Sequence, residues 1–98
     1  MFRYKLNIQA EEDLTRIFEY GMGRFGLLQA DKYYDMLFDC FSKIASNPYL
    51  FPNAIRYRDG YRYCVCGVDT IYYRINGNKR IEIIAIIGRQ DFDSTSLK

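Results

Sequence analysis

The segment from Arg56 to Phe92 constrains the fold more than any other part of the chain, because its apolar and polar residues alternate between tight turns. The runs 61–65, 71–75 and 81–87 have the alternating or continuously apolar character of strands. Asn76-Gly77 lies between the last two runs, and this pair favours a two-residue hairpin turn because both residues tolerate positive φ. The segment is therefore predicted to form three consecutive antiparallel strands.

The middle strand of this meander has two different faces. Residues 71, 73 and 75 point to one side and are predicted to be core, whereas Tyr72 and Arg74 point to the other side. Arg62 of the preceding strand, which leads into a turn near Gly67, is placed on this second face as well. Arginine and tyrosine dominate interface hot spots, so this second face is the one expected to bind a partner.

The first half of the chain is predicted to be mainly helical. Residues 2–8 alternate and predict a half-buried edge strand. The three acids at 11–13 mark a helix N-terminus, where negative charge is stabilised by the helix dipole. Gly26 ends this helix, and a second helix follows that Asn47-Pro48 stops. Apolar stripes give the helices core-facing sides: Leu14, Ile17, Phe18, Met22 and Phe25 in the first, and Ala30, Tyr34, Leu37, Phe38, Phe41, Ile44 and Ala45 in the second.

The order strand, helix, helix, strand, strand, strand predicts an α+β fold. An antiparallel helical hairpin packs on one face of a three- to four-stranded antiparallel sheet, with the N-terminal strand at an edge. The apolar loop 48–55 crosses from the helices to the sheet. No internal repeat or linker interrupts the 98 residues, so residues 1–98 are expected to form a single domain.

Composition adds two observations on partners. The chain has ten tyrosines and no tryptophan, and an excess of an amphipathic residue favours a contact surface as well as a core. The net charge of +2 is too small to predict nucleic-acid binding by itself. Its distribution is uneven, because residues 54–98 hold eight basic and five acidic side chains, against six and seven in residues 1–53.

The cysteines and the N-terminus bear on compartment and cofactors. Three cysteines, an odd number, argue against a disulfide framework and fit a reducing compartment. Without a histidine, Cys40, Cys64 and Cys66 lack the partners for a zinc site, so all three are interpreted as small buried hydrophobes. No cofactor or metal is expected. The N-terminus has no apolar run long enough for a signal peptide or a membrane span, which predicts a cytoplasmic protein without membrane contact.

Short motifs along nearly the whole chain carry a resemblance to a known family. They are Ala10-Glu11-Glu12-Asp13-Leu14, Phe25-Gly26, Gln29-Ala30, Ala45-Ser46-Asn47-Pro48, Gly60-Tyr61-Arg62, Ile71-Tyr72-Tyr73-Arg74 and Ile86-Ile87-Gly88-Arg89-Gln90-Asp91. In this order and spacing they resemble the ParE branch of the RelE/ParE toxin superfamily, the toxins of bacterial type II toxin–antitoxin modules. One position departs from the pattern, since Gly88 stands where many members have a histidine.

The resemblance implies a toxin that inhibits DNA gyrase by binding, trapping it on cleaved DNA, with no sequence-specific DNA binding of its own. It also implies neutralisation by a ParD-like ribbon-helix-helix antitoxin. The alternative is a RelE-like ribosome-dependent mRNA endonuclease, which must activate a ribose 2′-OH and protonate a leaving oxygen. The chain has no histidine, and tyrosine or arginine is a poor base at neutral pH. The binding hypothesis is therefore preferred, and no catalytic residue is assigned.

Two sets of residues are expected to carry these contacts. The target-binding set follows the second sheet face and the segment beyond the last strand: Arg62, Tyr72, Arg74, Arg89, Gln90 and Phe92. Phe92 either packs back on the sheet or binds outward. The antitoxin-binding set follows the apolar loop and the nearby arginines: Tyr49, Leu50, Phe51, Arg62 and Arg74.

Overall fold

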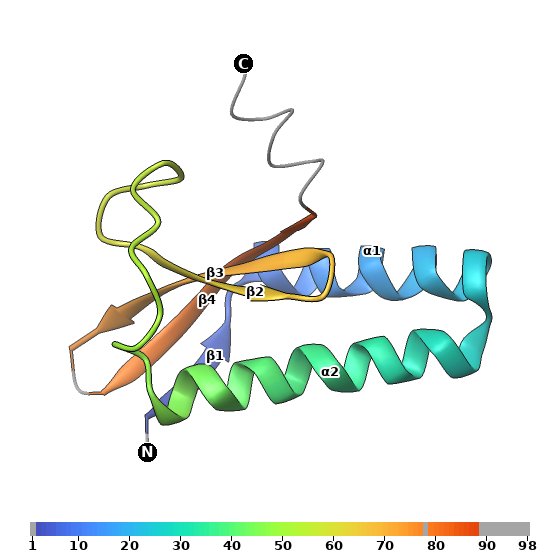
Figure 1. Cartoon of the computed structure of the whole chain (residues 1–98), viewed down its shortest axis with the longest axis horizontal. Coiled ribbons are helices and arrows are strands. Elements are labelled where there is room, and N and C mark those ends of the chain that lie inside the picture. Colours follow the sequence, from blue (N-terminus) through green and yellow to red (C-terminus); the bar gives the residue numbers. More distant parts are fainter. Residues whose placement is uncertain (1, 78, 89–98) are drawn as a thin grey trace.

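The computed structural model describes residues 2–77 and 79–88 of the chain. A helical hairpin lies on one side of a four-stranded sheet (Figure 1). The elements follow in the order β1 (Arg3–Leu6), α1 (Ile8–Phe25), α2 (Leu27–Ser46), β2 (Arg62–Cys66), β3 (Asp69–Asn76) and β4 (Arg80–Gly88). The α+β class and the predicted element order are confirmed.

The sheet is mixed, which corrects the expectation of an antiparallel sheet. Its strand order is β1-β4-β3-β2, and β1 pairs with β4 in parallel. Strands β2, β3 and β4 are antiparallel because short turns join them. The chain between β1 and the meander instead runs through both helices, and a connection of that length imposes no antiparallel return.

The two turns of the meander differ from each other. Gly67 and Val68 join Cys66 to its partner Asp69, and Gly67 has a φ of 62°, so the turn near Gly67 is confirmed. The predicted two-residue turn at Asn76-Gly77 is wrong. Asn76 pairs with Arg80, so three residues form the loop. Its positive φ of 57° falls on Lys79, the left-handed position that ends a three-residue hairpin loop.

Strand β1 is shorter than predicted because Asn7 begins a helix. The Asn7 side chain accepts a hydrogen bond from the Ala10 amide at 2.9 Å, which satisfies one of the free N–H groups of the first turn. Ile8, expected on the buried side of the strand, is therefore the first residue of α1, and its side chain is 75% exposed. The helix starts before the acidic cluster, which lies within it.

Gly26 separates the two helices at a φ of 90°, as its position at the end of the first apolar stripe predicts. Its amide donates to the Met22 carbonyl, and its carbonyl accepts from the Ala30 amide. Figure 1 shows the hairpin extending past the end of the sheet. Met22 and Phe25, expected in the core, are consequently exposed at 44% and 63%.

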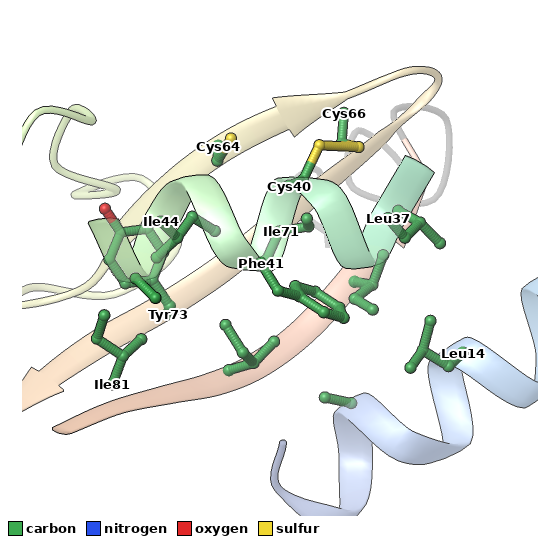
Figure 2. Close-up of a cluster of buried hydrophobic side chains, with 14 residues drawn as sticks. Leu14, Leu37, Cys40, Phe41, Ile44, Cys64, Cys66, Ile71, Tyr73 and Ile81 are labelled. Atoms are coloured by element: carbon green, nitrogen blue, oxygen red, sulfur yellow. A yellow bond between two sulfur atoms is a disulfide. The ribbon is translucent and has the colours of Figure 1, made fainter. Parts of the chain in front are cut away.

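The core lies between the hairpin and the inner face of the sheet (Figure 2). Tyr73 is fully buried there, as predicted, and its hydroxyl donates to the Pro48 carbonyl at 2.6 Å. The other large, fully buried side chains are Leu37, Phe41, Ile44, Ile71, Ile81, Ile83 and Ile86. Tyr34 of the predicted stripe is 38% exposed, since it lies near the overhanging end of the hairpin. The rest of the second stripe is buried or packs against the core.

Cys40 and Cys66 form a disulfide between α2 and β2, which corrects their interpretation as separate hydrophobes (Figure 2). Their Cα atoms are 6.6 Å apart and 26 positions separate them in sequence. Only the packing of α2 across β2 brings them together, so spacing alone gave no signal. The odd cysteine count therefore carries no weight on the redox compartment. Cys64 remains a buried free thiol, and its burial raises its pKa.

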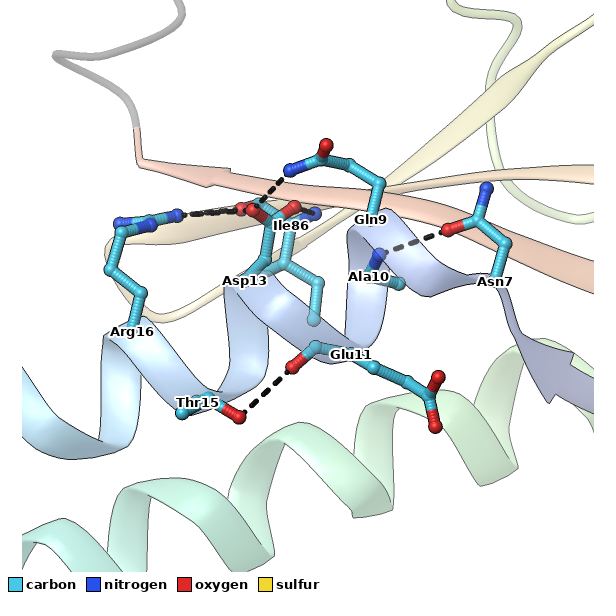
Figure 3. A network of polar contacts seen from close by, with 8 residues as sticks. All are labelled: Asn7, Gln9, Ala10, Glu11, Asp13, Thr15, Arg16 and Ile86. Carbon is cyan, nitrogen blue, oxygen red and sulfur yellow. Dashed lines mark hydrogen bonds and ion pairs between the residues drawn. The ribbon is translucent and has the colours of Figure 1, made fainter.

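A buried carboxylate ties α1 to the edge of β4 (Figure 3). Strand β1 covers β4 only at residues 80–83, so the backbone of Ile86 lies beyond its reach. Asp13, 6% exposed, accepts a hydrogen bond from the Ile86 amide at 2.9 Å, and Arg16 donates to the Ile86 carbonyl at 3.3 Å. Gln9 donates to the other Asp13 oxygen. Side chains of α1 thus continue the edge of the sheet where β1 ends.

Replacing this carboxylate should cost more than its size suggests. Asp13→Ala leaves the buried Ile86 amide without its acceptor, and an unsatisfied buried donor costs about 1–3 kcal/mol. Glu12→Ala is the matched control, because Glu12 is an exposed acid of the same helical turn and should change stability by less than about 0.5 kcal/mol. Urea unfolding followed by far-UV circular dichroism measures both. Equal free energies of unfolding for the two variants would contradict the role of Asp13.

Candidate functional site

The face of the sheet away from the helices, here called the outer face, holds a cluster of four tyrosines. Tyr72 and Tyr57 stack with ring centroids 4.3 Å apart, Tyr63 lies 6.3 Å from Tyr72, and Tyr61 lies 5.9 Å from Tyr57. Tyr72 is on the predicted face, but it is only 4% exposed because the loop before β2 folds over it. The rings that reach solvent are the half-buried ones at 57, 61 and 63.

Arg62 lies on the other face, which corrects its predicted position. It pairs with Tyr73, and residues directly opposite on neighbouring strands share a face. Its guanidinium donates to the Phe51 carbonyl at 2.6 Å and lies 5.4 Å from the centre of the Tyr49 ring. Arg62 therefore fixes the apolar loop to the sheet.

Arg74 is exposed on the outer face, as predicted. It forms an ion pair with Glu82, the residue opposite it on β4, at 2.8 Å. The hydrogen bond to Glu82 raises the pKa of the Arg74 guanidinium. Arg74 thus carries a positive charge held in a defined direction on an open surface.

The apolar loop is divided between core and surface. Tyr49 is 65% exposed and Leu50 75% exposed, whereas Phe51 is half-buried and packs against the core. Two of the three loop residues predicted to meet a partner therefore offer apolar surface to solvent.

The helical hairpin was expected to expose apolar surface to an antitoxin, but the residues at its overhanging end, which form a larger apolar surface than the loop, were not named as part of it from the sequence. This hairpin tip consists of Tyr20, Met22, Phe25, Leu27 and Leu28, all exposed by 44% or more. Leu27 and Leu28 lie outside the predicted core-facing stripe of α2, and two leucines away from that stripe were the sequence signal for this surface. The rest depends on the length of the helices relative to the sheet.

A groove of about 1070 Å³ runs from the hairpin tip to the Gly67-Val68 turn. At its inner wall the Tyr33 hydroxyl donates to Asp69 at 2.5 Å and accepts from the Val68 amide at 3.2 Å. Burial and the Asp69 carboxylate raise the pKa of Tyr33. A Cβ at Gly67 would lie 2.8 Å from Met36 Cε, so this wall is closely packed.

Three tyrosines near these surfaces have raised pKa values. Burial raises the pKa values of Tyr33, Tyr57 and Tyr73, so these phenols stay protonated at neutral pH and provide almost no phenolate to act as a general base. Within residues 2–77 and 79–88, no group of three or more metal-ligating side chains converges. Neither helix is long and apolar enough to cross a membrane.

The predicted residues Arg89, Gln90 and Phe92 lie outside the part of the chain that the structure describes. The described chain ends at Gly88, the last residue of β4, which also lines the groove.

Comparison with known proteins identifies the family. Residues 4–92 match the model for the ParE toxin of type II toxin–antitoxin system, parDE. The chain belongs to the ParE toxin family. The chain is 30% identical to Toxin ParE1 of Mycobacterium tuberculosis over 92 residues, which are 93% of this chain and 94% of that protein. It is 33% identical to Toxin ParE1 of Caulobacter vibrioides over 84 residues, 86% of this chain and 85% of the relative.

Two solved structures have the same fold as this ParE-family chain. The chromosomal ParDE TA system from P. aeruginosa matches with a TM-score of 0.79 at 19% identity, over 90% of this chain and 96% of that one. A toxin-antitoxin complex, RelBE2 of Mycobacterium tuberculosis, matches with a TM-score of 0.61 at 14% identity, over 90% and 98%. At these identities the two matches establish the architecture alone.

The raised tyrosine pKa values give this ParE-family toxin a defined response to alkali. Burial raises the pKa of Tyr73 above its ordinary value of 10.0, so the folded chain keeps a proton that the unfolded chain loses. The stability from this group is complete below about pH 10 and is lost as the pH rises toward the folded pKa. Tyr73→Phe removes this pH-dependent contribution of the Tyr73 hydroxyl to stability. Between pH 8 and pH 11 its free energy of unfolding should fall by roughly 1 kcal/mol less than that of the unmodified chain.

The matched control for this titration is Tyr20→Phe, because Tyr20 is 64% exposed. It should keep the full alkaline loss of stability. Urea unfolding at the two pH values measures each difference, and a Tyr73→Phe variant as sensitive to alkali as Tyr20→Phe would refute the assignment.

Proposed function

We propose that this toxin inhibits DNA gyrase by binding, without chemistry of its own, and that a ParD-like ribbon-helix-helix antitoxin neutralises it. The observation that carries the proposal is the extent of exposed apolar surface on a ParE-family chain. The hairpin tip and the Tyr49-Leu50 loop expose more large apolar side chains than a lone small domain usually keeps. Exposed apolar surface of this extent indicates a binding site for another protein.

The antitoxin is assigned to the helix side of the molecule. The hairpin tip and the Tyr49-Leu50 loop lie beyond opposite ends of α2, whose 20 residues span about 30 Å. One compact contact cannot cover both, so the partner is best described as an extended or helical segment that follows the hairpin. The groove beside the tip would receive the apolar side of such a segment.

The gyrase contact is assigned to the outer face and to the residues that follow β4. Arg74 is exposed and fixed by Glu82, and Arg89, Gln90 and Phe92 follow the end of β4 in sequence. Tyr72 supports this contact indirectly, through the tyrosine cluster, whereas Arg62 supports the antitoxin contact by fixing the apolar loop. The antitoxin is thus assigned to the helix side, and the Arg74 contact with the target to the outer face.

Adding charge to the apolar surfaces should weaken antitoxin binding. Leu28→Glu and Leu50→Glu place a carboxylate at side chains that are 69% and 75% exposed, so the fold is retained while apolar contact is lost. Each should weaken the complex by about tenfold or more, which corresponds to about 1.4 kcal/mol. Isothermal titration calorimetry with the proposed ParD-like antitoxin measures the affinity.

The control for both variants is Ile8→Glu. Ile8 is equally exposed, lies outside both surfaces, and tolerates an acid at the N-terminus of α1. It should bind the antitoxin like the unmodified toxin. Affinity that is unchanged in Leu28→Glu and Leu50→Glu would place the antitoxin elsewhere.

Loss of Arg89 should separate toxicity from folding. Loss of an interface arginine anchor costs about 2 kcal/mol or more of binding, so Arg89→Ala and truncation after Gly88 should both abolish toxicity with little change in circular dichroism. Arg24→Ala removes an exposed arginine from the hairpin and should remain toxic. Ile83→Ala should lose toxicity and antitoxin binding together, because a cavity at this fully buried side chain costs about 2–5 kcal/mol.

The direct measurement uses purified gyrase and supercoiled plasmid. The unmodified toxin should accumulate cleaved, protein-linked DNA, and the Arg89→Ala variant should not. If saturating toxin leaves supercoiling and cleavage unchanged, the gyrase assignment is wrong. Primer extension on transcripts after induction tests the nuclease alternative, and new cuts within translated codons would favour it.

A further inference from the structure

The register of the sheet gathers positive charge on its outer face. Arg3 pairs with Arg80 and Lys5 with Glu82 across the parallel β1–β4 contact, and Arg74 pairs with Glu82 from the other side. Tyr4, which lies between Arg3 and Lys5 in β1, shows which face these two residues are on. It pairs with the buried Ile81 on the inner face, so its neighbours are on the outer face. Arg3 and Lys5 therefore point outward together with Arg80, Glu82 and Arg74.

These residues form two rows across the strands, here called the basic rows. One row runs Lys5, Glu82, Arg74, and the other runs Arg3, Arg80, Asn76. Lys79 adjoins the second row, because its carbonyl accepts a hydrogen bond from the Arg3 amide at 3.2 Å. All five cations are exposed, and Glu82 is the single acid among these positions.

The second basic row has an energetic cost that the fold does not need. Arg3 and Arg80 are like charges at paired positions on parallel strands about 4.8 Å apart, so their guanidinium groups repel each other. Among the described residues, the ion pairs join Arg16 to Asp13 and Arg74 to Glu82, so no carboxylate offsets the Arg3–Arg80 repulsion. A polyanion laid across the rows would offset it.

We propose that the basic rows bind the phosphate backbone of duplex DNA. Duplex DNA presents one negative charge about every 1.7 Å along its axis, a dense linear array suited to exposed cations on an open face. A small anion would instead need donors that converge in a pocket, and the groove of this molecule is lined by other residues. Phosphate contacts carry no sequence information, so this binding is independent of sequence.

An acidic peptide is the less suitable occupant of this face. The apolar surface that a peptide would use lies at the hairpin tip and the Tyr49-Leu50 loop, whereas the outer-face rows consist of charged and amide side chains. The DNA contact goes beyond the proposed function, which requires the toxin to touch only the gyrase protein. Its test needs no gyrase, so the two proposals fail separately.

The test is fluorescence anisotropy of the full-length toxin with labelled duplexes of about 20 base pairs and two unrelated sequences, at roughly 50 to 200 mM salt. The expected result is binding of both duplexes with equal affinity. The slope of log K against log salt should be about −3 to −4, as for three to four phosphate contacts. The Arg3→Gln/Arg80→Gln double variant should reduce that slope by about 2 and weaken binding by tenfold or more at low salt.

The matched control is Arg24→Gln/Lys32→Gln, which removes the same charge from exposed positions on the helices. It should bind DNA nearly as well as the unmodified toxin. Thermal unfolding separates a binding role from a structural one, because removal of the Arg3–Arg80 repulsion should leave the melting temperature unchanged or raised. Three outcomes would overturn the proposal: no detectable DNA binding, equal weakening in both double variants, or tighter binding of a polyglutamate peptide of about 20 residues than of DNA at equal salt.

Discussion

Strand β4 is the element on which the rest of the structure depends. It pairs with β3 on one side and with β1 on the other, and its Ile86 backbone receives Asp13 and Arg16 of α1 where β1 ends. Its inner face supplies Ile81, Ile83 and Ile86 to the core, and its outer face holds Glu82 and Arg80. Strand β4 thus links β1, β3 and α1 through its backbone, and its isoleucines join the core on which both helices pack.

The two sides of the molecule are chemically different because of this central strand. Helices longer than the sheet leave apolar side chains exposed at the hairpin tip, on the side where the core also lies. Within residues 2–77 and 79–88 no helix covers the outer face, and the loop before β2 covers part of it by bringing Tyr57 onto Tyr72. On the β1 side of that face the strand register places Arg3, Lys5, Arg80 and Arg74 around Glu82. A net charge of +2 for the whole chain conceals this separation.

Much of the fold could be predicted from local pattern, and the failures share a cause. Alternation and continuous apolar runs identified every strand, and Gly26 and Asn47-Pro48 marked the helix ends, since these signals act within a few residues. The sequence carries no signal for the parallel direction of β1, because apolar and polar residues alternate in the same way in parallel and antiparallel strands. The disulfide and the burial of Tyr72 depend on which element crosses which, and no spacing in the chain records that.

The candidate site was less predictable than the fold for the same reason. Arg62 was assigned to the wrong face because the relation between two strands depends on the register across the Gly67-Val68 turn. Tyr49, Leu50 and Arg74 are exposed as expected, because loop and strand-face positions follow from local pattern. The hairpin tip and the basic rows arise from helix length and cross-strand pairing, so they become visible only once the strands are assembled.

The pairing of β1 with β4 has a consequence for the time at which this toxin can form. Arg3 to Leu6 meet Arg80 to Ile83, so residues 7–79 must all be synthesised before the first strand finds its neighbour. Contacts between such distant parts of a chain form late and slowly during folding. A nascent chain still on the ribosome therefore lacks its central strand, and with it the frame that holds both surfaces. The cell is therefore exposed to the finished toxin only after the residues of β4 have been synthesised.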